Sequence, residues 1–331
     1  MKKPNMSEAA RAERIPFDEI PIVDLALWFS GDEEAKEKVS GRVYKACREV
    51  GFLYIRNHGI PDMTVEATFE AAQRFFGMDE EAKRRVHYEK SGGYRGYIPL
   101  SGESSDPAAR GDLKESFDVG LVLDADDSGG GAATRMRSPN LWPENLPGFR
   151  EDIECYFDGV RSLAGTMFAL FATSLGMPGD TFDTRINRPI AQMRLLHYPP
   201  QDPPENEDYL GIGAHSDYEW FTILAQDAAG GLQVKHPSGR WVAAPPIPGT
   251  MVINVGEMLQ RWSNDAVLST PHRVVNLSGQ GRFSIPFFFG PNYDTPIAPL
   301  ESCVGPRNPS RYAPIRAGDF LAGRIKEVYG Y

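Results

Sequence analysis

Two histidines and one aspartate have the types and spacing of a metal site. His215 and Asp217 are separated by a single residue, and His272 follows further along the chain. Two imidazoles and one carboxylate on one face of a metal ion leave three coordination positions open. This facial arrangement is typical of non-haem Fe(II) sites that bind O2 and a co-substrate. The pattern therefore predicts an Fe(II) centre with O2 as a co-substrate.

Arg282 and Ser284 form a second chemical pattern. Residues i and i+2 of a strand project to the same side, so the guanidinium and the hydroxyl would lie together. Such a pair can hold a carboxylate by charge-assisted hydrogen bonds. A metal site beside a carboxylate anchor predicts a 2-oxo acid that chelates the iron. The alternative for Arg282 is an internal ion pair with an Asp or Glu side chain.

Neither pattern is specific alone, because short tripeptides of this kind are common by chance, and Asp217 alone would read as a turn residue. Their order, spacing and strand context together carry the prediction. The other histidines of the chain are interpreted as structural or surface residues: His58, His87, His197 and His236. His197 alternates out of phase with Arg194 and Tyr198, so it points outward if those two point inward.

Short stretches rich in β-branched and aromatic residues surround the two patterns. Gly and Pro turns separate them at roughly ten-residue spacing, which is typical of an all-β barrel or a double-sheet jelly roll. The expected strands are 191–198, 221–225, 231–235, 250–255, 272–276 and 282–289. A jelly roll can hold a metal between its two sheets, so these strands would bring the two patterns together.

Helical periodicity marks much of the remaining chain. The expected helices are 33–50, 61–76, 79–85, 149–175 and 318–329. The helix at 149–175 is long enough to back the β core. We therefore expect an α+β fold with a mainly β core. Three regions are expected: a mixed N-terminal region at 1–120, a mobile loop or linker at 121–146, and the backing helix with the jelly-roll core at 147–331. The loop contains three consecutive glycines.

Two N-terminal motifs extend the pattern. Ile20 to Leu25 reads as a strand, and Val50 to Ile60 ends in an Asn-His-Gly-Ile element. Together with the metal and carboxylate patterns, these motifs resemble the isopenicillin N synthase-like branch of the 2-oxoglutarate/Fe(II) oxygenases over nearly the whole chain. Within that family, the stretches 194–199, 230–235 and 261–265 are similar to thymine hydroxylases. The resemblance implies a double-stranded β-helix (jelly roll) that uses Fe(II), 2-oxoglutarate and O2.

The resemblance also implies roles for particular residues. Those expected to bind Fe(II) and carry catalysis are His215, Asp217 and His272, and those expected to bind the far carboxylate of 2-oxoglutarate are Arg282, Ser284 and Tyr198. For Tyr198 the alternative is a packing residue at a strand end. The implied reaction hydroxylates or desaturates a small organic metabolite and releases succinate and CO2. Three alternatives stay open: a same-fold oxidase that does not use 2-oxoglutarate, an ethylene-forming enzyme, and a non-catalytic metabolite-binding protein.

Strand phase also predicts substrate contacts. Arg194 shares a face with Tyr198, Phe288 shares a face with Arg282, and Tyr218 directly follows Asp217. Arg194, Tyr218 and Phe288 would therefore line a pocket beside the iron that suits a flat polar molecule. The alternative is that these aromatic side chains belong to the core.

Composition narrows the class of partner. The chain has 331 residues, 41% of them hydrophobic and 24% charged, which is ordinary for a soluble globular protein. A net charge of −10 argues against nucleic acid and anionic membranes as partners. No apolar span is long enough for a transmembrane helix, and the polar N-terminus lacks the pattern of a signal peptide. The three scattered cysteines are typical of free thiols in a reducing compartment. We expect a cytoplasmic enzyme, a monomer or weak homo-oligomer, that acts on a small molecule.

Overall fold

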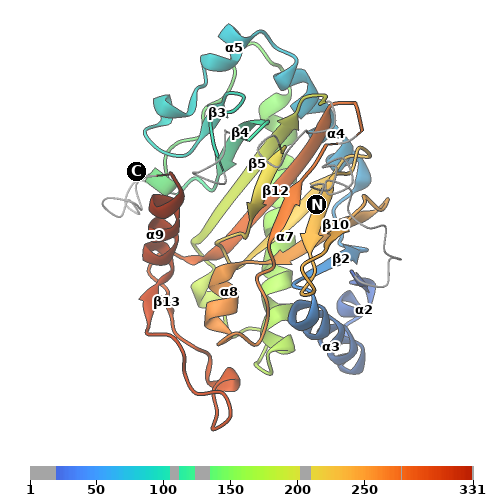
Figure 1. The fold of residues 1–331 in the computed structure, drawn as a ribbon, viewed down its shortest axis with the longest axis vertical. Coiled ribbons are helices and arrows are strands. Elements are labelled where there is room, and N and C mark those ends of the chain that lie inside the picture. The colour runs from blue at the N-terminus through green and yellow to red at the C-terminus, as the bar shows by residue number, and fades with distance from the viewer. Residues whose placement is uncertain (1–19, 105–111, 124–134, 202–209, 277, 330–331) are drawn as a thin grey trace, which may run out of the picture.

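The main β-sheet forms the floor on which the site is built. A computed structural model describes residues 20–104, 112–123, 135–201, 210–276 and 278–329. In these ranges the main sheet has eight strands in the order β1-β2-β10-β7-β12-β5-β4-β3 (Figure 1). Its strands are β1 (Ile22–Asp24), β2 (Phe52–Arg56), β3 (Gly96–Ile98), β4 (Glu115–Gly120), β5 (Pro189–Tyr198), β7 (Phe221–Gln226), β10 (Thr250–Val255) and β12 (Arg282–Asn292).

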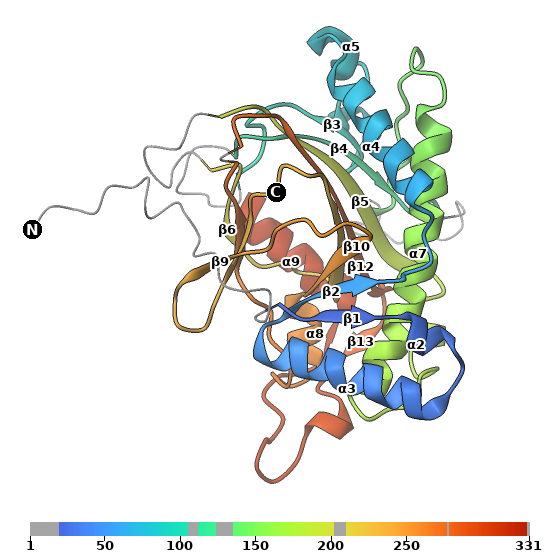
Figure 2. The ribbon, with the colours of Figure 1, turned by 90° about the vertical axis from the view of Figure 1, so that its right-hand side faces the viewer.

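A smaller sheet faces the main sheet (Figure 2). Its order is β6-β11-β8-β9, from strands β6 (Ile212–His215), β8 (Leu232–Lys235), β9 (Trp241–Ala243) and β11 (His272–Val274). Residues of both sheets line one cavity. Apolar side chains of both sheets, among them Leu196, Leu224, Leu232 and Val274, pack in one buried cluster between them. The mainly β core with two facing sheets is therefore confirmed, and strand bounds differ from the expected ones by a few residues, as at β12.

Helix α7 (Phe149–Ser174) backs the outer face of the main sheet, as its length predicted (Figure 2). Its buried residues recur at helical spacing and meet aromatic side chains of the sheet. Phe157 lies edge-on to Phe287 with ring centroids 5.3 Å apart, and Phe168 lies edge-on to Phe289 at 5.4 Å. Because residues 287 and 289 point outward into this layer, the alternate residues of β12 point into the cavity.

The N-terminal region extends the same sheet at both edges. Strand β1 pairs with β2, which pairs with β10, while β3 and β4 join the opposite edge beside β5. The associated helices are α2 (Ala26–Phe29), α3 (Glu33–Glu49), α4 (Asp62–Phe76), α5 (Glu80–Arg84) and η2 (Tyr88–Ser91). The division of the chain into three regions stays a prediction. Of its loop at 121–146, residues 124–134 lie outside the described ranges, as does the polar segment before residue 20.

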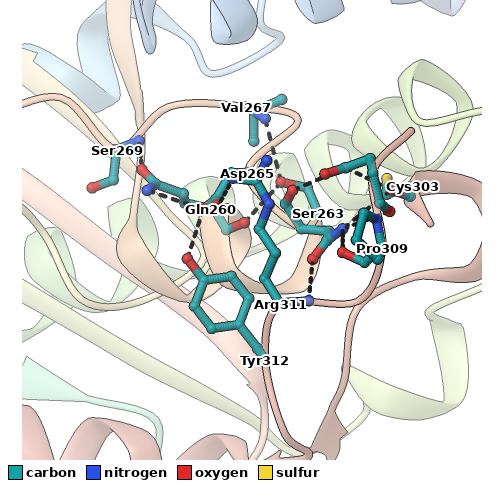
Figure 3. A network of polar contacts seen from close by, with 11 residues as sticks. Gln260, Ser263, Asp265, Val267, Ser269, Cys303, Pro309, Arg311 and Tyr312 are labelled. Atoms are coloured by element: carbon teal, nitrogen blue, oxygen red, sulfur yellow. Dashed lines mark hydrogen bonds and ion pairs between the residues drawn. The ribbon is translucent and has the colours of Figure 1, made fainter. Parts of the chain in front are cut away.

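A polar network fixes the segment that leads from α8 (Glu257–Trp262) into β11 (Figure 3). The Ser269 backbone N–H donates to the Gln260 side chain at 2.6 Å, and the Tyr312 hydroxyl donates to Asp265 at 2.8 Å. Asn264 and Asp265 both have positive φ, which a sharp turn requires. Because His272 is the first residue of β11, the network also sets where this imidazole enters the cavity.

The C-terminal segment closes one end of the molecule (Figure 1). It contains β13 (Pro296–Ile297), the short helical turn η6 (Glu301–Cys303), β14 (Ile315–Arg316), which pairs with β13, and helix α9 (Ala317–Tyr329). A second short turn, η4 (Asp183–Arg185), lies earlier in the chain, before β5. Leu321 and Ile325 of α9 reach the cavity between the sheets. Among the residues that the structure describes, no helix is both long and apolar enough to cross a membrane.

Candidate active site

His215, Asp217 and His272 converge at the cavity. His215 ends β6 and His272 begins β11, and the antiparallel register places these two residues opposite each other. The Asp217 Oδ1 atom lies 3.7 Å from His215 Nε2 and 3.6 Å from His272 Nε2. One ligand atom from each of the three residues lies within 4.8 Å of the others. This geometry suits a single metal ion bound on one face.

Hydrogen bonds select which nitrogen of each imidazole faces the cavity. His215 Nδ1 lies 2.8 Å from the Gly213 carbonyl, and His272 Nδ1 lies 3.3 Å from the Thr270 carbonyl. A carbonyl oxygen only accepts, so each Nδ1 carries the proton and each Nε2 keeps a free lone pair. Metal-ligating histidines are commonly oriented in this way by a partner on the other ring nitrogen. The donor set therefore fits Fe(II).

The two oxygens of Asp217 have different surroundings. Oδ2 accepts hydrogen bonds from the Thr222 hydroxyl and, at 2.6 Å, from the Asn254 side-chain amide. Thr222 and Asn254 are register partners on the adjacent strands β7 and β10. Oδ1 is left facing the two imidazoles. Sequence reasoning missed both donors, and no motif spacing points to them because they meet Asp217 only after the strands pair.

The electrostatics favour the protonation state that a divalent cation needs. Burial alone would raise the pKa of Asp217, but His272, His215 and the two hydrogen bonds hold that pKa below its ordinary value. Burial, followed by the neighbouring His215, lowers the pKa of His272 to about 4. The site thus presents a carboxylate and neutral imidazole, and metal ligands must be deprotonated in this sense.

Arg282 is a buried cation with neutral partners. It is 1% exposed and donates to the Gly230 carbonyl and, at 2.9 Å, to the Ser284 hydroxyl. Its guanidinium carbon lies 4.7 Å from the centre of the Tyr198 ring, which faces it from the paired strand β5. Across the described ranges, no carboxylate pairs with this guanidinium. The internal ion pair considered as an alternative is therefore absent there, and the cluster suits an anionic ligand.

The metal cluster and the Arg282 cluster open into one cavity of about 190 Å³ between the two sheets. The residues that line it include Arg194, Tyr198, Tyr218, Arg282, Ser284, Pro286 and Phe288. Tyr218 and Phe288 both border the cavity, and Tyr218 also packs against a small apolar cluster, so their role in substrate binding stays a prediction. All nine residues proposed for metal, co-substrate and substrate are thus brought together.

Arg194 differs from Arg282 in having acidic partners. Its Nε lies 2.9 Å from Asp118 Oδ1, and its Nη2 lies 2.7 Å from Glu103 Oε2. Lys114 adds a second cation at 2.7 Å from Glu103. Burial opposes ionisation of Glu103, but Arg194 and Lys114 lower its pKa to about 2. Sequence reasoning missed these acids and Lys114, which reach the cavity from β4 and the segments before it.

Two further residues complete the wall beside the metal cluster. Tyr218 lies under Arg324 of α9, whose guanidinium carbon is 5.0 Å from the ring centre, and Arg324 pairs with Glu257 at 2.8 Å. Glu219 also lines the cavity. Burial and then the charge of Asp217 raise the pKa of Glu219 to about 7. The sequence analysis did not select Glu219, although it follows Tyr218 directly.

The histidines set aside in the sequence analysis lie elsewhere. His197 stacks on Phe283 with ring centroids 4.7 Å apart and contacts Glu115 at 2.8 Å, on the outer face of β5. His58 accepts from the Ile60 backbone N–H through Nδ1 at 3.3 Å, and His236 lies in a turn beside Ser238. His87 Nδ1 lies 3.5 Å from Glu89 Oε2. None of the four lines the cavity in the described structure.

Two family models match the chain. Residues 20–145 match the non-haem dioxygenase in morphine synthesis N-terminal model, and residues 189–291 match the 2OG-Fe(II) oxygenase superfamily model. The second match contains the metal pattern as well as Arg282 and Ser284. Both matches agree with the expected α+β fold and with its double-stranded β-helix core.

Full-length relatives cover the same span. The 2-oxoglutarate-Fe(II) type oxidoreductase hxnY of Emericella nidulans is 35% identical over 94% of this chain and 90% of its own length. A homoarginine-6-hydroxylase of Glycine max is 32% identical over 93% and 97%. Full-length thymine 7-hydroxylase of Neurospora crassa, solved in complex with alpha-KG and thymine, superimposes with a TM-score of 0.82 at 31% identity, covering 94% of this chain and 97% of that one.

Proposed function

The chain belongs to the 2OG-Fe(II) oxygenase superfamily, and we propose that it hydroxylates a small, planar, polar metabolite beside the iron. It is a 2-oxoglutarate- and Fe(II)-dependent oxidoreductase. The observation that carries the proposal is the shared cavity: a three-residue metal cluster, an uncompensated buried Arg282, and a wall of aromatic and charged side chains open into the same space.

In the proposal, His215, Asp217 and His272 hold Fe(II) through Nε2, Oδ1 and Nε2. When bound, Fe(II) with 2-oxoglutarate and O2 supplies an oxidant that hydroxylates a C–H bond while 2-oxoglutarate leaves as succinate and CO2. Thr222 and Asn254 keep Oδ2 of Asp217 occupied, so Oδ1 stays aimed at the metal. Gly213 and Thr270 keep both imidazoles in the tautomer that ligates.

Arg282, Ser284 and Tyr198 are proposed to hold the far carboxylate of 2-oxoglutarate. A carboxylate beside Arg282 would provide the counter-charge that this buried guanidinium lacks, and charge-assisted hydrogen bonds of this kind are strong. Ser284 is already oriented by its hydrogen bond from Arg282. The rigid β12 strand therefore sets the depth at which the co-substrate lies relative to the metal cluster.

Arg194, Tyr218 and Phe288 are proposed to border the primary substrate. Two aromatic planes favour a flat molecule, with stacking worth about 0.5–1.5 kcal/mol beyond area burial. Ion pairs with Asp118 and Glu103 fix the Arg194 side chain, which makes it a rigid wall that offers directed contacts. The thymine bound to the Neurospora crassa enzyme and the substrate named for the homoarginine hydroxylase make pyrimidines and guanidino compounds the first candidates.

A metabolite screen tests the proposal. Purified enzyme with Fe(II), ascorbate, 2-oxoglutarate and labelled O2 would be incubated with planar polar compounds, and succinate release measured with product mass. A substrate should raise succinate release above the uncoupled rate and gain one labelled oxygen atom. A product that loses two hydrogens instead would identify a desaturase, and the absence of stimulation by every planar polar compound would contradict the proposal.

Matched variants locate the substrate. Phe288→Ala and Tyr218→Ala should raise the KM of the stimulating substrate by roughly tenfold, because each removes a ring that borders the cavity. Phe29→Ala is the control, since Phe29 is 52% exposed on α2 and does not line the cavity. An unchanged substrate KM in both cavity variants would contradict the substrate position while leaving the metal and co-substrate roles intact.

A further inference from the structure

Apart from Glu219, the charged residues that line the cavity fall into two sets: one whose cations are paired within the protein, and one that becomes neutral when the enzyme is loaded. In the first set, Arg194 and Lys114 face Glu103 and Asp118 at ion-pair distances, and Lys114 also lies 3.9 Å from Asp112. The two cations are therefore paired within the protein and require no anion from a ligand. With Glu103 and Asp118 they form one wall of the cavity, built from the middle of β4 and β5 and from the segments that precede β4.

The second set becomes neutral when the enzyme is loaded. Fe(II) carries two positive charges and 2-oxoglutarate two negative charges, while Asp217 and Arg282 carry one of each sign. This set rests on the proposed function, in which both residues bind these groups. A loaded site thus needs no further charge at the metal or at the Arg282 cluster.

Glu219 belongs to neither set. It lines the cavity beside Tyr218 and is half-buried there. Among the residues with described placement, no side chain donates a hydrogen bond to this carboxylate or forms an ion pair with it. A half-buried carboxylate without a cation is less favourable than a paired one, so a cation that enters the cavity and displaces its water would stabilise it.

Aromatic rings surround the same space. Tyr88, Tyr94, Tyr218 and Phe288 all line the cavity. Aromatic faces attract cations through their quadrupole, most strongly where water is excluded. A wall that combines one unpaired carboxylate with aromatic rings favours a cation over a neutral molecule of equal shape.

We propose that Glu219 binds a protonated nitrogen group of the primary substrate, so that the substrate class is a metabolite with an amine, amidine or guanidine. The inference rests on the proposed function and deepens it. An amidinium or guanidinium is also planar, which agrees with the aromatic walls on either side. Arg194 then acts as a wall and not as the anion-binding group of this cavity, because Asp118 and Glu103 already pair with it.

Two pairs of probes with equal shape and different charge test the inference: benzamidine against benzamide, and arginine against citrulline. Binding would be measured by calorimetry to the full-length enzyme loaded with Fe(II) and 2-oxoglutarate, in the absence of O2. In at least one pair the cation should bind about tenfold or more tightly than its neutral partner, as expected for a charge-assisted hydrogen bond. If the cation binds no more tightly in either pair, or neither cation binds, the inference is overturned.

Glu219→Gln provides the decisive variant, because it removes the charge, keeps the size and keeps one of the two acceptor oxygens. The cation-to-neutral preference should fall to about one. A folding defect would weaken both members of a pair, so the ratio separates recognition from stability. Glu37→Gln, the same change at an exposed position of α3, should keep the full preference. A preference that survives Glu219→Gln overturns the inference.

The inference and the proposed function fail in different ways. If an uncharged planar compound is hydroxylated with the same KM by the native enzyme and by Glu219→Gln, the proposed function stands and the inference is overturned. If cations bind in a manner that requires Glu219 but no planar compound raises succinate release, the inference is supported and the proposed function fails.

Discussion

Arg282 and Arg194 face one cavity from neighbouring strands, yet their surroundings are opposite. Arg282 is buried among neutral partners, the Gly230 carbonyl and the Ser284 hydroxyl. Arg194 pairs with two carboxylates, from Asp118 and Glu103. The two arginines therefore have different uses. Arg282 lacks a counter-charge, which a ligand can supply, whereas Arg194 already has the carboxylates of Asp118 and Glu103 as counter-charges.

This difference divides the cavity into two ends. The Arg282 end suits an anion, which assigns it to the carboxylate of 2-oxoglutarate in the proposed function. At the other end Arg194 and Lys114 are already paired, and Glu219 is a carboxylate without a side-chain partner among the described residues. The metal cluster of His215, Asp217 and His272 borders the same cavity as both environments, so ligands bound at either would share it with the metal.

The largest expected effect comes from removing the metal cluster that both ends share. His215→Ala, Asp217→Ala and His272→Ala should each abolish stoichiometric iron binding and 2-oxoglutarate turnover, because each change removes one of three donors. Iron content by elemental analysis and succinate release would be measured on the same samples. His236→Ala is the control, since His236 lies in a turn away from the cavity. Full iron and activity in any of the three variants would exclude that residue as a ligand.

Exchanging each arginine for lysine tests the comparison itself. Arg282→Lys should raise the KM for 2-oxoglutarate by roughly tenfold to a hundredfold, since a point charge cannot reproduce the planar fork and hydrogen bonds to charged groups contribute about 1.5–3 kcal/mol. Arg194→Lys should leave that KM within about twofold and lower the melting temperature, because it weakens a buried ion-pair cluster. Steady-state kinetics and thermal unfolding would separate the two. Equal effects of both variants on the KM for 2-oxoglutarate would remove the distinction between the ends.

The two ends also differ in how well the sequence predicts them. His215 and Asp217, like Arg282 and Ser284, are two residues apart, and the two-residue period of a strand places such pairs on one side. The same period correctly put Arg194 and Phe288 in the wall of the cavity. Local geometry was therefore enough to predict that His215, Asp217 and His272 lie together, that Arg282 lies beside Ser284, and that two sheets face each other.

The partners of those residues depend on contacts that have no local signal. Asp118 and Glu103 reach Arg194 from 76 and 91 residues away along the chain. Thr222 and Asn254 meet Asp217 only because β7 and β10 pair in a particular register. Tertiary structure decides whether a charged side chain has a partner. The sequence therefore predicted that Arg194 lines the cavity but not that Asp118 and Glu103 pair with it. For the same reason it did not select Glu219.

Removing a hydrogen-bond donor to Asp217 should weaken iron binding less than removing a metal ligand does. Asn254→Ala should weaken iron affinity by roughly tenfold, because partners of this kind orient the ligand and set its basicity. Turnover at saturating iron should largely recover, which distinguishes an orienting residue from a ligand. Iron titration followed by succinate release would measure both quantities. Asn308→Ala, in the C-terminal segment away from the cavity, is the matched control. Iron affinity equal to that of the control would refute the role.

Ser284→Ala is expected to have the smallest effect at the Arg282 end. The change removes one hydroxyl that accepts from Arg282 at 2.9 Å and is proposed to donate to the co-substrate carboxylate. Loss of one such hydrogen bond costs about 1 kcal/mol, so the KM for 2-oxoglutarate should rise about fivefold with little change in kcat. The substrate KM should not move, because Ser284 lies at the anion end and Glu219 at the other. Kinetics with each ligand varied in turn would show this split. A rise in substrate KM without a rise in the KM for 2-oxoglutarate would mean that the two ends have been assigned in reverse.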